Sequence, residues 1–199
     1  MDAAISLFLR KGYLSSSMDE VAAIAKVSKQ TVYKHFADKD SLFNEIVMAT
    51  IESTYDSFAP SILRDVAATD DLETGLRRFG RQMITALMQP EPIQMRRLVI
   101  TEANRFPDLG RYYYERTYQR TVESLADALQ LHVDKGSLEV SDAVLASHQF
   151  CWLIFAIPRN QVMLCGDGVR FTQAELHRAA DAGVDTFLRA FARQAAPGA

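Results

Sequence analysis

The stretch from Val27 to Phe36, VSKQTVYKHF, constrains the chain more than any other segment. Its length suits a helix of only about two turns, and the Ser28 hydroxyl can cap that helix by accepting from an amide in its first turn. Val27, Val32 and Phe36 can point into a small core. The remaining surface, on which no acid lies, carries Ser28, Lys29, Gln30, Thr31, Tyr33, Lys34 and His35. Such a face suits the DNA major groove, because early side chains reach base edges and later ones reach phosphates.

The residues before this stretch predict a second short helix that begins after Ser17. Ser17 and Glu20 have the spacing of a capping box, in which each satisfies a backbone amide of the other. Lys26 occupies the connecting turn, where helix-turn-helix units often carry glycine. Apolar residues recur at helical spacing, at Met18, Val21, Ala22 and Ala25. The pair has the helix-turn-helix plan, with the second helix as reader. A plain helical hairpin with a solvated basic face is the alternative that spacing alone leaves open.

Helical periodicity continues through the rest of the chain, and strand-like alternation never persists. Further helices are expected over 1–11, 39–58, 72–87, 93–105, 107–135, 141–157 and 172–194. Pro60 is predicted to end one helix, and Pro158 to kink or break another. The fold class is therefore all-α with about nine helices. A three-helix helix-turn-helix domain over 1–46 precedes a larger bundle over 47–199, and the helix that begins at Lys39 joins the two.

Composition narrows the functional classes. The 199 residues, 48% of them apolar, can bury a sizeable core, yet they contain no apolar run long enough to span a membrane. The chain begins without the pattern of a secretory signal, and Cys151 and Cys165 fit a reducing compartment, so we expect a cytoplasmic protein. A net charge of −3 argues against indiscriminate nucleic-acid binding. The segment 26–39, however, carries four lysines against Asp38, a local patch compatible with a site-specific DNA reader.

The N-terminal residues resemble the DNA-binding domain of the tetracycline-repressor (TetR) family. The residues that carry the resemblance are Leu7-Phe8, Lys11-Gly12-Tyr13, Ser17 to Ala22, Val27 to Phe36 and Lys39 to Phe43, with uninterrupted spacing over about the first 47 residues. A second stretch, Arg97 to Leu109 followed by Tyr113 to Arg116, resembles the AefR-like branch of that family. The resemblance implies an all-helical homodimer, double-stranded operator DNA with two-fold related half-sites, and a C-terminal domain that binds a small effector.

The family's DNA contacts can be carried over by position. The resemblance implies that Lys29, Gln30 and Thr31 meet bases and adjoining phosphates, and that Tyr33 and His35 contact the DNA backbone. Lys39 matches a lysine that steadies a phosphate at a helix start. Ser17 and Met18 match another helix start that touches the backbone, while Lys34 lies in a variable family position. Family members usually carry a basic arm before the first helix. Here either the numbering begins inside the natural protein or the arm is absent.

The last two helices are expected to form the homodimer interface. An apolar stripe runs along the final helix, through Leu176, Ala180, Val184, Phe187, Leu188 and Phe191. Small residues such as Ala180 and Gly183 would permit close approach of a partner helix. An intramolecular core is the other explanation of such a stripe. The helix-turn-helix favours the dimer, because one reader of this size rarely gives enough specificity alone.

An effector pocket is expected among bulky or adaptable side chains of the bundle, with a mainly apolar or aromatic ligand. The candidates are Met83, Leu87, Phe106, Tyr113, Tyr118, His148, Trp152 and Phe155. Ordinary core packing is the alternative for each of them. His148 and Cys151 are three residues apart, but two ligands are too few for a metal site, so neither a metal nor a cofactor is expected.

These observations predict a dimeric transcriptional regulator, a repressor that a small effector releases from its operator. The rival is a helical-bundle enzyme or small-molecule carrier whose N-terminal helices make only protein contacts. An enzyme would need a nucleophile–base pair or a metal cluster, and the sequence contains neither pattern, so we predict that the chain is not an enzyme.

Overall fold

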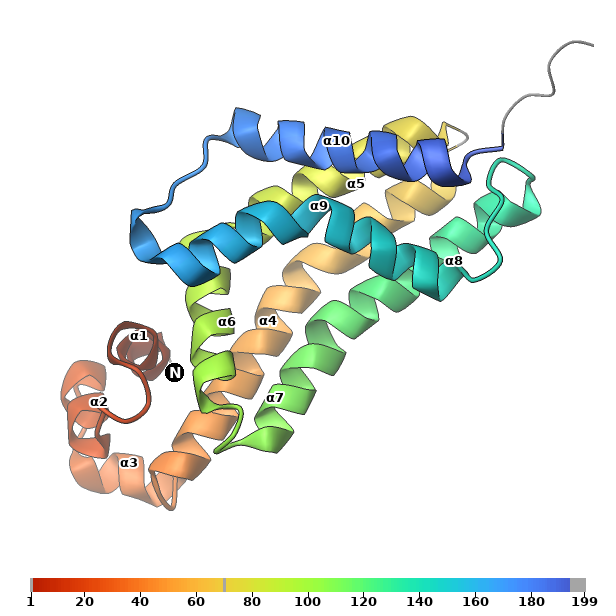
Figure 1. Ribbon diagram of the computed structural model, residues 1–199. Coiled ribbons are helices and arrows are strands. Elements are labelled where there is room, and N and C mark those ends of the chain that lie inside the picture. The colour runs from red at the N-terminus through yellow and green to blue at the C-terminus, as the bar shows by residue number, and fades with distance from the viewer. Residues whose placement is uncertain (1, 70, 194–199) are drawn as a thin grey trace, which may run out of the picture. The chain divides into compact units, whose positions relative to one another are not determined.

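The computed structural model describes residues 2–69 and 71–193, and most of these residues lie in helices (Figure 1). The elements in chain order are α1 (Asp2–Lys11), α2 (Met18–Ala25), α3 (Lys29–His35), α4 (Lys39–Ala68), α5 (Leu72–Leu87), α6 (Pro90–Glu102), α7 (Pro107–Tyr113), η1 (Tyr114–Gln119), α8 (Arg120–Asp134), α9 (Ala143–Cys165), η2 (Gly166–Gly168) and α10 (Gln173–Phe191). The turn η1 is π-helical and joins α7 to α8 without a break, so the α-helices over the described ranges number nine if that run counts once. The predicted all-α class is confirmed.

Local signals in the sequence account for most helix starts. Asp71, Asp142 and Thr172 each cap a helix by accepting from the amide three residues later. Gly136 follows α8 with a φ of +77°, a left-handed conformation that glycine adopts without steric cost. Phe106 precedes Pro107, whose missing N–H costs nothing in the first turn of α7.

Pro60 was predicted to end a helix and does not, and Pro158 was predicted to kink or break one and does not break it. α4 continues past Pro60 to Ala68, and α9 continues through Pro158 to Cys165. A proline removes one hydrogen bond from a helix interior, and Pro158 is itself buried among apolar neighbours that favour continuing the helix. The ribbon of α9 bends part-way along its length, as helices that contain proline often do (Figure 1). α5 ends at Leu87, as predicted, and Pro90 begins α6, where the first turn of a helix tolerates proline.

The chain forms two compact units. Unit 1 comprises residues 1–57 and 90–118, and unit 2 comprises residues 58–89 and 119–199. Unit 1 is centred on an aromatic cluster in which Phe43 lies 4.9 Å from Tyr13 and 5.1 Å from both Phe8 and Phe106, measured between ring centroids. Phe106 belongs to the loop between α6 and α7. That loop therefore shares a core with α1 and with the start of α4.

Unit 2 is built on α10, which packs against both α5 and α9 (Figure 1). Phe150 of α9 lies between Phe79 and Phe187, at centroid distances of 5.9 and 5.1 Å. Along the α5–α10 contact, Arg77 pairs with Asp185 and Arg81 pairs with Asp181 at 2.6 Å.

The buried His132 of α8 places its Nε2 atom 3.1 Å from the carbonyl oxygen of Val66, near the end of α4. Within the described ranges, no helix is long and apolar enough to cross a membrane. Over the same residues, no three or more His, Cys, Asp or Glu side chains are grouped to hold a metal ion.

Candidate nucleic-acid interface

The predicted helix-turn-helix is α2 followed by α3, and its two helix starts are capped as expected. The Glu20 amide donates to Ser17 Oγ over 3.2 Å, and the Ser17 amide donates to Glu20 Oε2 over 3.1 Å. The Thr31 amide donates to Ser28 Oγ over 3.1 Å. Lys26 ends α2 with a φ of +57°, the one positive φ at a non-glycine position among residues 2–69 and 71–193. Lys26 thus adopts the left-handed conformation in which glycine is more usual.

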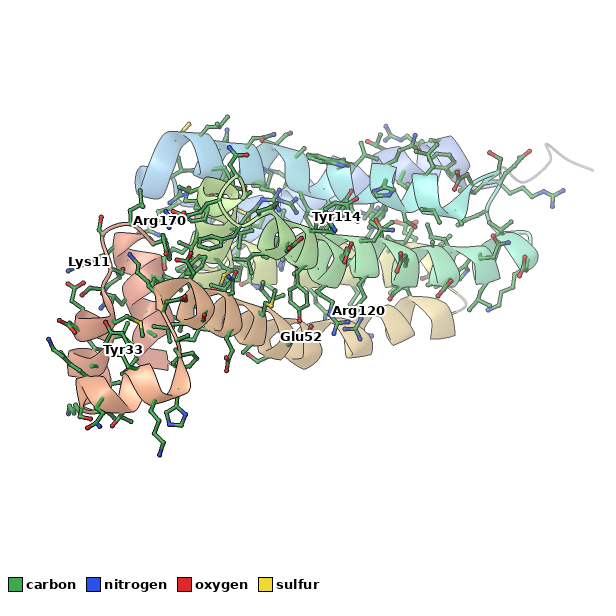
Figure 2. All side chains as sticks on the ribbon, turned by 90° about the horizontal axis from the view of Figure 1, so that it is seen from below. Lys11, Tyr33, Glu52, Tyr114, Arg120 and Arg170 are labelled. Atoms are coloured by element: carbon green, nitrogen blue, oxygen red, sulfur yellow. The ribbon has the colours of Figure 1, made fainter. Side chains whose placement is uncertain are left out.

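The helix α3 buries one side and exposes the rest. Val32 is 6% exposed and anchors the helix to the core of unit 1. The remaining side chains line a shallow, open concavity formed by Ser28, Gln30, Thr31, Tyr33, Lys34 and His35. Tyr33, labelled in Figure 2, is 53% exposed although it is a large aromatic residue. The concavity offers hydroxyl, amide, imidazole and ammonium donors and no carboxylate, which is the chemistry that phosphates and base edges require.

Lys29 is placed differently from its neighbours. Its Nζ atom lies 2.5 Å from Oδ2 of Asp19, which lies in the first turn of α2. The two side chains are 66% and 53% exposed, so this pair lies at the surface beside the concavity. Sequence reasoning missed the contact because the two residues are ten apart and meet only once the turn brings α3 back against α2.

Lys39 and Met18, both predicted to contact phosphate, are held by protein groups. Lys39 Nζ lies 4.2 Å from the centroid of the Tyr13 ring and donates to the carbonyl oxygen of Leu14 over 3.3 Å. The Met18 side chain is buried in the unit 1 core. Its backbone amide, in the first turn of α2, is the group that an incoming phosphate can use. Ser17 is exposed, but its hydroxyl already accepts from the Glu20 amide.

Tyr13 is surrounded by a cluster that the sequence did not reveal. Its hydroxyl donates to Asp40, and the Arg105 guanidinium lies 4.7 Å from the ring centroid and 3.8 Å from the same carboxylate. Burial, and then the hydrogen bond to Asp40, raise the pKa of Tyr13 to about 12. Arg105 belongs to the loop between α6 and α7. The cluster therefore ties that loop to the residues around Lys39 at the start of α4.

The eight pocket candidates are divided between the two units. Unit 1 holds Phe106, which is buried in the aromatic cluster, and the half-buried Tyr113 and Tyr118. Unit 2 holds the buried Met83 and Phe155, the half-buried Leu87 and His148, and Trp152, which is 50% exposed. Beside Tyr113, Tyr112 and Arg116 both donate to Glu52, which is labelled in Figure 2.

The apolar stripe on α10 is largely an intramolecular core, the alternative that the sequence left open. Leu176, Ala180, Val184 and Phe187 are all buried within unit 2. A different set of large apolar residues is exposed, and it lies on α9: Val144, Leu145, Trp152, Leu153, Ile157 and Leu164. Ile157 is 70% exposed, and the six residues recur along the whole length of the helix. Leu153, Ile157 and Leu164, at positions i, i+4 and i+11, share one side of the helix, and an exposed apolar face of this kind is typical of protein–protein contacts.

Comparison with known sequences matches two parts of the chain to described protein families. Residues 1–46 match the family described as bacterial regulatory proteins, tetR family. Residues 74–193 match the AefR-like transcriptional repressor, C-terminal domain. A curated relative, the HTH-type transcriptional repressor Rv3405c of Mycobacterium tuberculosis H37Rv, is 27% identical over 159 residues, which are 78% of this chain and 71% of that protein.

Solved structures resemble the chain over nearly its full length. A TetR-family transcriptional regulator from Mesorhizobium loti MAFF303099 is 38% identical, with a TM-score of 0.88, and the match covers 96% of this chain and 94% of that one. The flavonoid-responsive regulator FrrA is 30% identical, with a TM-score of 0.75, over 98% of this chain and 95% of that one.

Proposed function

Because the chain belongs to the TetR family of helix-turn-helix transcriptional regulators and repressors, we propose that it represses transcription by binding a two-fold operator with α3 and that a small effector releases it. We also propose that the protein acts in the cytoplasm, the compartment that an operator-binding role requires. The observation that carries the proposal is the acid-free concavity on α3, where Gln30, Thr31 and Tyr33 are exposed while Val32 anchors the helix.

The proposed docking puts the start of α3 against base edges and its end against the backbone. Gln30 and Thr31 supply amide and hydroxyl groups to bases. Tyr33, Lys34 and His35 supply donors to phosphates, as do Ser17, Lys39 and the Met18 amide at two further helix starts.

The test uses the full chain and a duplex selected from a random library by the wild-type protein. Replacing Tyr33 with Ala should weaken binding at least tenfold, because one phosphate contact is lost from each reader of a dimer. Replacing the exposed Tyr114 with Ala is the matched control, since its ring lies outside α3. Helicity and oligomeric state should stay unchanged in both variants. Equal affinity of the Tyr33 variant and the wild type would contradict this docking.

We propose that the homodimer forms through α9 and α10, with the exposed apolar face of α9 at its centre. The burial of the α10 stripe supports an interface carried mainly by α9, and Trp152 then belongs to that interface rather than to a pocket. Replacing Ile157 with Glu should give monomers in sedimentation analysis and abolish binding to the selected duplex. Leu131 of α8 is the control, because the same substitution at this exposed leucine lies outside the face. A dimeric Ile157 variant would refute the proposed interface.

The proposed effector is small and mainly apolar or aromatic. The likeness to FrrA, which is described as flavonoid-responsive, supports an aromatic class. We retain Met83, Leu87, His148 and Phe155 of unit 2 as candidate effector contacts, and Tyr113 and Tyr118 as separate candidates in unit 1, where Phe106 belongs to the aromatic cluster. A panel of flavonoids, with straight-chain fatty acids as the non-aromatic set, should contain compounds that dissociate the protein from the selected duplex. Replacing Phe155 with Ala should change the response to such a compound but leave DNA affinity in its absence unaltered.

The enzyme or carrier alternative shares the helical architecture but lacks support from the comparisons, whose named relatives are transcriptional regulators. A steep fall in DNA affinity with added salt distinguishes a reader from a helical unit that makes only protein contacts.

A further inference from the structure

Within the described ranges, Asp19 is the one carboxylate that forms an ion pair with a predicted base-reading cation of α3. Its Oδ2 atom lies 2.5 Å from Nζ of Lys29, the first residue of the reader helix. The neighbouring acid of α2, Glu20, is engaged elsewhere: it pairs with Lys11 of α1 at 2.5 Å and closes the capping box with Ser17. Asp19 thus differs from Glu20 because its cation belongs to the reader.

Stability does not explain the pair. Both side chains are more than half exposed, and ion pairs in that setting contribute little to the free energy of folding. Asp19 makes no cap of its own, since Ser17 and Glu20 already fulfil that role at the start of α2. Asp19 therefore acts on the binding of groups, such as DNA bases and phosphates, that approach Lys29 from solvent.

We propose that Asp19 is a specificity-determining residue of the reader, which positions Lys29 for a guanine and disfavours phosphate at the same place. The inference rests on the operator-binding function proposed above. An ammonium has three donors, so Lys29 can keep its contact with Asp19 and still donate to guanine O6 or N7 in the major groove. Outside the correct register Lys29 meets backbone phosphates, and the adjacent carboxylate repels them.

This arrangement acts on non-specific binding more than on specific binding. Non-specific affinity comes almost entirely from phosphate neutralisation, and a carboxylate beside a cation cancels its charge for a phosphate. Two unit charges about 7 Å apart in water interact with an energy close to the thermal energy, so one carboxylate lowers phosphate affinity about threefold at low salt. A dimer with two reader helices multiplies the factors, which gives about tenfold.

The experiment replaces Asp19 with Asn in the full chain. The probes are a duplex selected by the wild-type protein from a random library and a shuffled duplex of equal length and composition. Asp19→Asn should bind the shuffled duplex about tenfold more tightly and should lower the ratio of selected to shuffled affinity by a similar factor. On the shuffled probe, the dependence of log affinity on log salt should steepen by up to about 0.9 per reader. Asp19→Ser should act in the same direction.

Two controls make the result decisive. Glu139→Gln removes the same charge at an exposed residue of unit 2 and should leave the ratio unchanged, whereas an equal effect would reduce the finding to net charge. In a Lys29→Gln background the Asp19→Asn effect should shrink, because no ammonium then draws a phosphate to within about 7 Å of the carboxylate. An undiminished effect there, or an unchanged ratio in Asp19→Asn, overturns the proposal. If the wild-type protein selects no duplex over shuffled DNA, the operator-binding function itself fails.

Discussion

The crossing of α9 and α10 depends on a residue without a side chain, and adding one carbon should weaken unit 2. A Cβ at Gly183 would lie 3.0 Å from Cγ1 of Ile154 and 3.1 Å from the carbonyl carbon and oxygen of Leu153. The Leu153 atoms are backbone and cannot rotate away, so the helices must separate by a few tenths of an ångström. Overpacking of this kind costs about 1–3 kcal/mol. Alanine regains about 1 kcal/mol of helix propensity, which leaves a net loss of about 1 kcal/mol.

A second glycine provides the matched control with the opposite expected sign. Gly110 lies inside α7, and a Cβ there would lie 3.4 Å from Cβ of Ala103, an ordinary contact. Gly110→Ala should therefore stabilise the protein by about 0.5–1 kcal/mol, because alanine loses less backbone freedom on folding. Urea unfolding followed by circular dichroism measures both variants. One protein concentration is required, since dimerisation makes apparent stability depend on concentration.

The expected outcome is a lower urea midpoint for Gly183→Ala and a higher one for Gly110→Ala, at unchanged slope. In thermal unfolding, 1 kcal/mol corresponds to a shift of about 2–4 °C for a chain of this size. A Gly183 variant as stable as the wild type would show that α9 and α10 are less closely packed than the 3.1 Å distance requires. A destabilised Gly110→Ala variant would contradict the gain of about 1 kcal/mol that the estimate for Gly183→Ala assigns to the helix propensity of alanine.

Two further predictions concern titratable groups. The pKa of Tyr13 is raised to about 12 from an ordinary value near 10, so the stability that its neutral phenol contributes is complete below pH 10 and is lost as the pH rises to 12. Tyr13→Phe should remove this alkaline loss in urea unfolding and, at neutral pH, destabilise the fold by about 1 kcal/mol as Asp40 loses a donor; an unchanged alkaline loss would contradict the assignment. Cys165 is exposed and should react with a thiol reagent in the native protein, whereas Cys151, buried and with its pKa raised to about 12, should react only after unfolding; equal rates would refute that difference.

The reader was predictable from sequence because its determinants are local. Ser17 with Glu20, and Ser28 with Thr31, lie within one turn of each other, and capping at that distance depends little on the rest of the fold. The exposed face of α3 followed from the position of Val32, since a helix this short buries only one side. The pairing of Lys29 with Asp19 was not predictable in this way, because it depends on the angle at which α3 leaves the turn.

Helix ends and interfaces were less predictable, each for its own physical reason. Pro158 disrupts a helix locally, but whether the helix ends depends on the packing around it, and here that packing favours continuation. The apolar stripe on α10 predicted which face of that helix is buried, but it did not predict whether the same chain or a partner chain covers that face. Val184 and Phe187 are covered by the same chain, whereas Ile157 is one of the apolar residues of α9 that remain exposed.

The loop between α6 and α7 lies beyond residue 46 in the chain, yet it belongs to the compact unit that carries the reader. Phe106 contributes a ring to the cluster beneath α1 and the start of α4, and Arg105 shares the Tyr13 ring with Lys39. A domain boundary drawn along the sequence separates these residues from the reader, because chain order does not report which segments share a core. Any displacement of this loop changes the environment of Tyr13 directly, and Lys39 lies on that same ring. A conformational change that reaches α6 or α7 therefore needs no further relay to alter a lysine predicted to hold DNA phosphate.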